Sequence, residues 1–260
     1  MKERLKRAGK KFLVAFLFMA AWAVLARGVD RELLLPTPWA VLRTLGELAG
    51  QGEFWQSIAL SLWRVLLGYL GGVIVAVLLA VLCAVSSTMK EVIFPALRVI
   101  RSTPVASFIL LALVWLPSPQ VPVLTAALMV IPVVFGPLLQ AIEDVDVELL
   151  EMMHFFRIKK RTVIRKLYIP SVAPQFGAAC VTAEGLAWKA SIAAEVLATP
   201  ALSIGKGIYE TKLYLETPEL FAWTLTVILL SVGFEELVKR IFAATAGRKK
   251  AALSVQRGEI

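Results

Sequence analysis

The sequence is poor in charge, in cysteine and in histidine. Of its 260 residues only 18% are charged, two are cysteines and one is a histidine, whereas 58% are hydrophobic. Cys83 and Cys180 lie in apolar stretches and His154 stands alone, so neither a disulfide framework nor a metal-binding spacing is present. A chain with so little polar cover is not expected to be a water-soluble globular protein.

Motifs for catalysis are also missing. The run Ser203-Ile204-Gly205-Lys206-Gly207 contains a Gly-Lys pair but lacks the upstream glycine and the following Ser or Thr of a phosphate-binding loop. The acids between Glu143 and Glu148 lie in a charged stretch, where solvation explains them. We therefore expect no enzymatic activity, no cofactor and no metal site. An intramembrane hydrolase is the weaker alternative, because it needs a nucleophile and a base that the sequence does not offer.

Long apolar blocks, separated by short charged stretches, are abundant instead. Blocks of this length predict membrane-spanning helices, and no block alternates as a barrel strand would. We predict an all-α integral membrane protein of about six transmembrane helices, of which the first and third are short and borrow flanking residues. The predicted spans are Phe12–Ala26, Ile58–Val85, Pro104–Leu116, Val121–Ile142, Val172–Ala198 and Leu220–Phe242.

The formal charge of +9 is unevenly distributed between the connecting segments. With six spans, 21 of the 28 basic residues fall on one side and five on the other, while Arg64 and Lys189 lie inside apolar blocks. The side with the excess is cytoplasmic by the positive-inside rule, so both termini are predicted to be cytoplasmic. The positive charge is thus an orientation signal in contact with membrane lipid, and nucleic-acid binding is not expected.

The first block has a second interpretation. A basic region, an apolar stretch and Val24-Leu25-Ala26 also resemble a cleavable signal peptide. The even number of spans favours retention of this block, because its removal would leave five helices. An N-terminus at Arg27 in the purified protein would support cleavage.

The longest predicted cytoplasmic loop, residues 143–169, carries an apolar cluster. The cluster consists of Met152, Met153, Phe155 and Phe156. Leu149, Leu150, Met153 and Phe156 recur near helical spacing, and a basic stretch follows them. This pattern predicts two short amphipathic helices that present a docking surface to a partner. The alternative is a helix that lies on the membrane with basic anchors.

The same loop resembles a signature of the permease subunits of ATP-binding-cassette importers. That signature runs Glu-Ala-Ala, three residues, Gly, nine residues and then Ile-x-Leu-Pro. It aligns with Glu151-Met152-Met153, with Arg157 and with Leu167-Tyr168-Ile169-Pro170, and the spacing is kept in full. The chain departs from the family in having Met-Met for Ala-Ala and Arg157 for the turn glycine, and glycine is the residue that adopts positive φ without strain.

From about Leu35 to Phe242 the chain resembles one branch of these permeases, the nitrate, sulfonate and taurine type. It departs from the branch at Gly136, where Asn is frequent, and at residues 116–119, where a Phe-Gly turn is usual. The motifs that carry the resemblance are Leu35-Pro36-Thr37-Pro38, Ser61-Leu62-Trp63-Arg64-Val65 with Gly68, Leu97-Arg98 with Pro104 and Ala106, and Ala187-Trp188 with Glu195 and Gly205.

The resemblance implies a single transmembrane permease domain over residues 1–260, with a core at 57–242 and the type I importer permease fold, in the bacterial cytoplasmic membrane. It also implies a second permease copy, two separate ATPase subunits and an extracytoplasmic solute-binding protein as partners. The residues expected to couple to the ATPase are Glu151, Met152, Met153, Phe156, Arg157, Ile169 and Pro170. The alternative is an ion-coupled secondary transporter, but the sequence shows no internal repeat of the kind such transporters have.

Polar residues inside the apolar blocks are candidates for function, because intramembrane charge is costly. Arg64 is expected to extend to the lipid headgroups. Glu184, Trp188, Lys189 and Glu195 share one block and are predicted to line the pathway, with Lys189 facing the solute or pairing with Glu184. A structural ion pair that locks two helices is the alternative.

Two further expectations concern packing and the solute. Gly68 and Gly72 allow close helix approach, within the subunit rather than in a dimer contact. Lys189 favours a small anion such as a sulfonate or nitrate, whereas Trp188 fits a heterocyclic vitamin precursor nearly as well.

Overall fold

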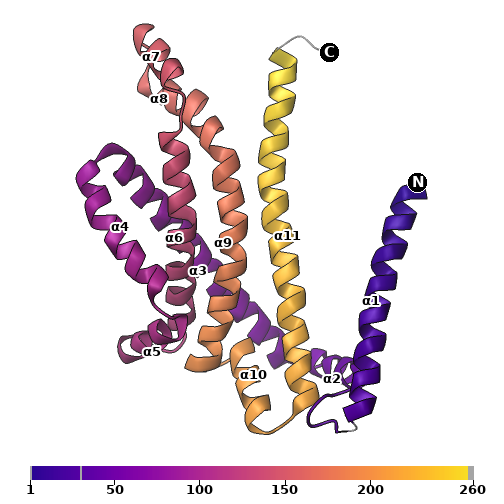
Figure 1. Cartoon of the computed structure of the whole chain (residues 1–260). Coiled ribbons are helices and arrows are strands. Elements are labelled where there is room, and N and C mark those ends of the chain that lie inside the picture. The colour runs from indigo at the N-terminus through magenta and orange to yellow at the C-terminus, as the bar shows by residue number, and fades with distance from the viewer. Residues whose placement is uncertain (1, 30, 257–260) are drawn as a thin grey trace.

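The computed structural model describes residues 2–29 and 31–256, and within them it places the side chains of 16–29 and 31–242. Every regular element in these ranges is helical, in agreement with the predicted all-α class (Figure 1). The elements are α1 (Lys2–Val29), α2 (Pro38–Ala49), α3 (Gly52–Val85), α4 (Ser87–Ser102), α5 (Val105–Trp115), α6 (Val121–Glu143), α7 (Val147–Phe155), α8 (Lys160–Val163), a π-helical turn (Ile164–Tyr168), α9 (Ile169–Ala198), α10 (Ile204–Leu213) and α11 (Thr217–Gln256).

Three of these helices are long and apolar enough to cross a membrane: α3, α6 and the part of α11 from Thr217 to Phe242. In α1 the side chains are described from Phe16 onward, and the stretch Phe16–Val29 is apolar. Helix α9 has 30 residues and is therefore about 45 Å long. It is not counted among the helices apolar enough to cross a membrane, because Glu184, Lys189 and Glu195 lie within it.

The predicted third span, Pro104–Leu116, is not a spanning helix by itself. Helix α5 has 11 residues, about 16 Å of rise against a hydrocarbon layer of about 30 Å. It follows α4 in a pair bent by 104°. The bend falls where Thr103 is extended before Pro104, as expected for a residue that precedes proline. The prediction of six straight spanning helices is therefore not confirmed, and the described residues give three such helices, or four if the bent pair is one span.

The chain changes direction in a regular order. Helices α1, α4 and α9 run one way, and α3, α6 and α11 run the other (Figure 1). Both ends of the chain and α7 therefore lie at one end of the molecule, whereas α2, α5 and α10 lie at the opposite end. We call these the α7 end and the α10 end.

Arg257, one of the predicted cytoplasmic cations, lies outside the described residues.

The centre of the molecule is the packing of α6 against α3 on one side and α9 on the other. A Cβ atom at Gly68 would lie 2.6 Å from Cβ of Ala126, and one at Gly72 would lie 2.7 Å from Cβ of Val130. These distances are too short for any larger residue, so the glycines let α3 and α6 approach closely. The prediction that they pack within the subunit is confirmed.

Helix α4 is also bonded to α6. Arg101, in the last turn of α4, donates to the carbonyl oxygen of Pro132 at 2.5 Å. A Cβ atom at Gly136 would lie 3.3 Å from the Arg101 Nη2 atom. Glycine at 136, where the related permeases often have Asn, therefore leaves room for this guanidinium.

Gly72→Ala is expected to destabilise the protein by about 1–3 kcal/mol, because the new methyl group overpacks against Val130. The matched control is Gly71→Ala on the same helix, where a Cβ meets nothing within 4 Å and the better helix propensity of Ala stabilises by up to about 1 kcal/mol. Thermal unfolding of both variants in detergent measures the difference. Equal midpoints for the two variants would contradict the packing.

Candidate functional site

A buried ion pair joins three helices near the α10 end. Glu195 of α9 is fully buried, and its carboxylate accepts from Arg64 Nη1 of α3 at 3.0 Å and from Ser61 Oγ at 2.7 Å. It also accepts from the backbone amide of Gly205, in the first turn of α10, at 3.2 Å. Ser61 Oγ in turn accepts from the amide of Ile204 at 3.0 Å. One carboxylate thereby fixes α3, α9 and α10 relative to one another.

The turn between α9 and α10 depends on the same arginine. Thr199 and Leu202 have positive φ values of 41° and 49°, a strained conformation for residues with side chains. Arg64 donates to the carbonyl oxygens of Ala201 and Leu202, at 3.3 Å each. A Cβ atom at Gly205 would lie 2.3 Å from Cβ of Glu195, so only glycine fits there.

One prediction about these residues is wrong. Arg64 does not extend to the lipid headgroups, since it is 7% exposed and pairs with Glu195. Glu195, which was predicted to line the pathway, is buried within the subunit and forms a structural ion pair of the kind given as the alternative. The two residues are 131 positions apart, so helical periodicity within either block could not show the pair. The sequence held one indication of the pair. Ser61, Arg64, Glu195 and Gly205 all belong to the motifs by which the chain resembles the permease branch.

The remaining polar residues of α9 divide into a buried and an exposed set. Glu184, Trp188 and Ser191 are buried, and their polar side-chain atoms have no hydrogen-bond partner among the described residues. The predicted partner of Glu184, Lys189, is exposed, so that ion pair is absent. Of the four predicted pathway residues, only Lys189 reaches the surface of the subunit.

Lys189 lies on an exposed face of α9 with an unusual composition. The face follows helical spacing and consists of Thr182, Leu186, Lys189, Ala193 and Leu197. The exposed face of α3 consists of large apolar residues throughout, Leu60, Trp63, Leu67, Leu70 and Ile74. The α3 face suits lipid, whereas small residues and a lysine on α9 suit contact with protein or water.

The segment between α6 and α9 holds the predicted pair of short helices, and it projects beyond the bundle at the α7 end (Figure 1). Asp146 caps α7 by accepting from the amides of Glu148 and Leu149, at 2.9 and 3.3 Å. The exposed surface of the segment is apolar at Met152, Phe155 and Phe156, whose exposed fractions are 47%, 82% and 67%. Glu151 and Ile169 are exposed as well, while Met153 and Pro170 are half-buried.

Helix α7 ends in a Schellman motif, a turn in which the residue after the helix cap adopts the left-handed conformation. The amide of Ile158 bonds to the carbonyl of Met153 at 3.0 Å, and that of Arg157 bonds to His154 at 2.9 Å. The left-handed residue is Arg157, with φ of 50°. The position that aligns with the turn glycine of the signature is thus left-handed with arginine in place, at the steric cost of a side chain at positive φ.

The chain from Lys160 onward is one helical path. After α8, the amide of Ile169 bonds to the carbonyl of Ile164, five residues earlier, and this forms the π-helical turn that leads into α9. Pro170, which has no amide hydrogen, occupies the first turn of α9. The exposed apolar cluster is thus joined by the short turn at residues 156–159 to a helical path that leads into the helix carrying Lys189 and Glu195.

The all-helical fold with several apolar helices is that of a membrane-embedded subunit. Residues 36–244 match the family of binding-protein-dependent transport system inner membrane components. The chain belongs to this family, so it is an ATP-binding-cassette transporter permease and a multi-pass protein of the bacterial inner membrane. The family is a transport component without catalytic activity, and the ATPase of these systems is a separate subunit.

Similar proteins transport small solutes. The chain is 26% identical over 242 residues to a putative aliphatic sulfonates transport permease of Bacillus subtilis, covering 90% of this chain and 87% of the relative. It is 22% identical to the taurine transport system permease of Escherichia coli, covering 88% and 86%. It is 25% identical to the nitrate import permease of Leptolyngbya laminosa, covering 80% and 77%.

The fold is that of a solved transporter. The crystal structure of an amino acid ABC transporter with histidines superposes with a TM-score of 0.61, covering 78% of this chain and 97% of that one, at 17% identity. This structural likeness supports the predicted permease fold.

Glu195→Ala is expected to destabilise the protein by about 3–5 kcal/mol, because it leaves the Arg64 guanidinium buried without its partner. Arg43→Ala breaks the exposed Arg43–Glu47 pair and is the control, with an expected cost below about 1 kcal/mol. Thermal unfolding in detergent measures both. A Glu195→Ala midpoint as close to wild type as that of the control would show that the buried pair does not hold the helices together.

Proposed function

We propose that the chain forms the translocation pathway of an ATP-driven importer and receives its driving force through α7. The observation that carries the proposal is the exposed cluster of Met152, Phe155 and Phe156 on a loop that projects from the bundle. Exposed apolar side chains gathered on a helix in water mark a docking surface. The partner that a permease of this family requires at such a surface is the ATPase.

The proposed assembly contains two permease copies, two ATPases and a solute-binding protein. The α7 end faces the cytoplasm, since the excess of basic residues lies in the segments at that end. The chain crosses the membrane six times, with the bent α4–α5 pair as the third crossing. The two permease copies pair with the exposed faces of α9 toward each other, so that Lys189 borders the pathway.

The connection from α7 to α9 offers a direct mechanical link. When ATP closes the ATPases, α7 moves with them and carries α9 through the turn at residues 156–159 and the helical path from Lys160 through Ile164–Tyr168. Alternating access follows if the ATP-bound ATPases have different affinities for the inward-open and outward-open permease. The buried Glu195 network keeps α9 attached to α3 and α10 at the other end.

A small anion is the proposed solute. The relatives are named for aliphatic sulfonates, taurine and nitrate. Lys189 is the charged residue on the exposed face of α9, and a cation there suits an anionic solute. Trp188, which fitted a heterocyclic vitamin precursor, is buried and does not reach this face. It therefore gives no support to such a solute.

Replacing both Phe155 and Phe156 by Asp is expected to reduce co-purification of the cognate ATPase about tenfold or more, because two anchors of the docking surface become charged. Both side chains are exposed in the free subunit, so the fold is expected to survive. The amount of ATPase bound per permease, measured in detergent, checks the result.

Arg157→Gly is the control for the loop. Glycine takes the observed φ of 50° without strain, so this variant is expected to keep the ATPase and to be equal to wild type in stability or up to about 1 kcal/mol better. Wild-type ATPase binding by the double Asp variant would show that the ATPase docks elsewhere.

A further inference from the structure

A pocket of about 310 Å³ opens at the α10 end, where α2, α3, α10 and α11 meet. Its walls include Phe54 and Ser57 of α3, Lys206 and Glu210 of α10, and Trp223 of α11. Gly207 permits this arrangement, since a Cβ atom there would lie 2.6 Å from the Trp223 ring. None of the predicted pathway or coupling residues lines it.

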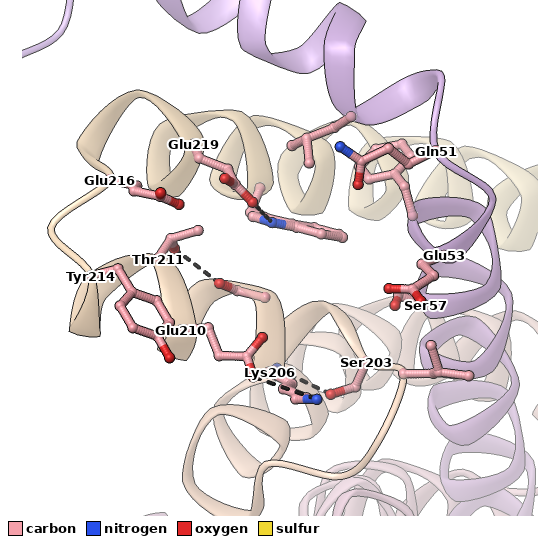
Figure 2. Close-up of a pocket in the computed structure, with 15 residues that line it drawn as sticks. Gln51, Glu53, Ser57, Ser203, Lys206, Glu210, Thr211, Tyr214, Glu216 and Glu219 are labelled. Carbon is pink, nitrogen blue, oxygen red and sulfur yellow. Dashed lines mark hydrogen bonds and ion pairs between the residues drawn. The ribbon is translucent and has the colours of Figure 1, made fainter.

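The pocket is strongly acidic. Figure 2 shows Glu216 and Glu219 on one side of the opening and Glu53 on the other, with Glu210 and Lys206 below them. Four carboxylates and one ammonium leave a net charge of −3. Lys206 already pairs with Glu210 at 3.4 Å, and Glu219 accepts the indole N–H of Trp223 at 3.2 Å. Within the described part of the chain, no cation pairs with Glu53, Glu216 or Glu219.

Two other kinds of group in the pocket suit a cationic ligand. The rings of Trp223 and Phe54 lie 4.9 Å apart between centroids and are tilted by 45°, and Tyr214 also lines the pocket. Aromatic faces beside carboxylates bind an alkylammonium or a guanidinium group well. Ser57 is only 7% exposed and lines the pocket, yet its hydroxyl has no hydrogen-bond partner among the described residues. This unpartnered hydroxyl is available to accept from a ligand N–H.

The pocket is unsuited to the proposed solute. The sulfonate and nitrate named for the relatives are anions, and a site with a net charge of −3 repels them. A cationic side chain of a protein that docks at this end fits the charge, the aromatic walls and the free hydroxyl.

We propose that this pocket receives a lysine or arginine side chain of the solute-binding protein. The proposal rests on the proposed function, which places that protein at the α10 end. The charge steers the docking encounter and fixes its orientation, which is what complementary charge at an interface does.

The pocket also adjoins the buried ion pair. Leu202 and Ser203 line it, and Leu202 is one of the residues whose carbonyl oxygen accepts from Arg64. The next two residues, Ile204 and Gly205, donate their amides to Ser61 and to Glu195. A side chain seated in the pocket therefore contacts the turn that is bonded to α9. This contact gives the docked protein a physical route to the helix with the exposed Lys189.

The test uses the assembled permease–ATPase complex in lipid nanodiscs and the cognate solute-binding protein. Glu53→Gln combined with Glu216→Gln removes two charges from residues that are exposed and bonded to no cation. We expect the dissociation constant of the binding protein to rise about tenfold at low salt, and its dependence on salt to become weaker. ATP hydrolysis without the binding protein is expected to be unchanged.

Glu47→Gln is the matched control, because Glu47 is an exposed acid at the same end that does not line the pocket. It should leave the dissociation constant within about twofold of wild type. The same small change in the Glu53/Glu216 variant would overturn the proposal. A second result would also overturn it. If wild type binds spermidine saturably, and the Glu53/Glu216 variant loses this binding but keeps its affinity for the binding protein, the occupant of the pocket is a free cation.

Failure of the proposed function has a different signature. If the wild-type complex does not bind the solute-binding protein at all, both proposals are wrong. Binding that is equal in the wild type and the Glu53/Glu216 variant refutes the pocket alone.

Discussion

One buried carboxylate sets the geometry on which the rest of the subunit depends. An uncompensated charge in the interior of a helix bundle costs several kcal/mol, so Glu195 must be surrounded by donors. Arg64, Ser61 and the amide of Gly205 provide them, and they come from α3 and α10. The register of α3 against α9, the strained turn at residues 199–203 and the glycine at 205 all follow from satisfying this group. Above it, the close approach of α3 to α6 at Gly68 and Gly72 completes a rigid core.

This anchor divides α9 into parts with different tasks. One end of the helix is held to α3 and α10, while the other continues through a π-helical turn into the projecting loop. Between the two ends runs an exposed face with Thr182, Lys189 and Ala193. The helix that borders the proposed pathway is therefore connected to a proposed docking surface at each end of the molecule. One surface is apolar and holds Phe155 and Phe156, and the other is acidic and holds Glu216 and Glu219.

Much of this architecture could be predicted from the sequence, because apolar length and charge asymmetry are strong signals in a membrane protein. The helical class, the loop with its two short helices and the packing glycines were predicted from such local patterns. The expectation for Arg64 was wrong because its partner lies 131 positions away along the chain. The burial of Glu195 and Glu184 could not be predicted either, because a distant partner, or the direction a helix faces, decides whether a charge is buried. The third span is not confirmed as a single helix, because two helices bent by 104° stand in its place. At Arg157 the backbone adopts the positive φ that glycine adopts without strain.

The central claim is that solute movement through this subunit is driven by ATP and not by an ion gradient. Uptake into proteoliposomes that contain the permease and the cognate ATPase, with the solute-binding protein and radiolabelled sulfonate or nitrate outside, measures this directly. With ATP sealed inside, we expect accumulation that persists when ionophores collapse the proton and sodium gradients, and none with a non-hydrolysable analogue. Accumulation without ATP that requires an ion gradient and is abolished by ionophores would contradict the account.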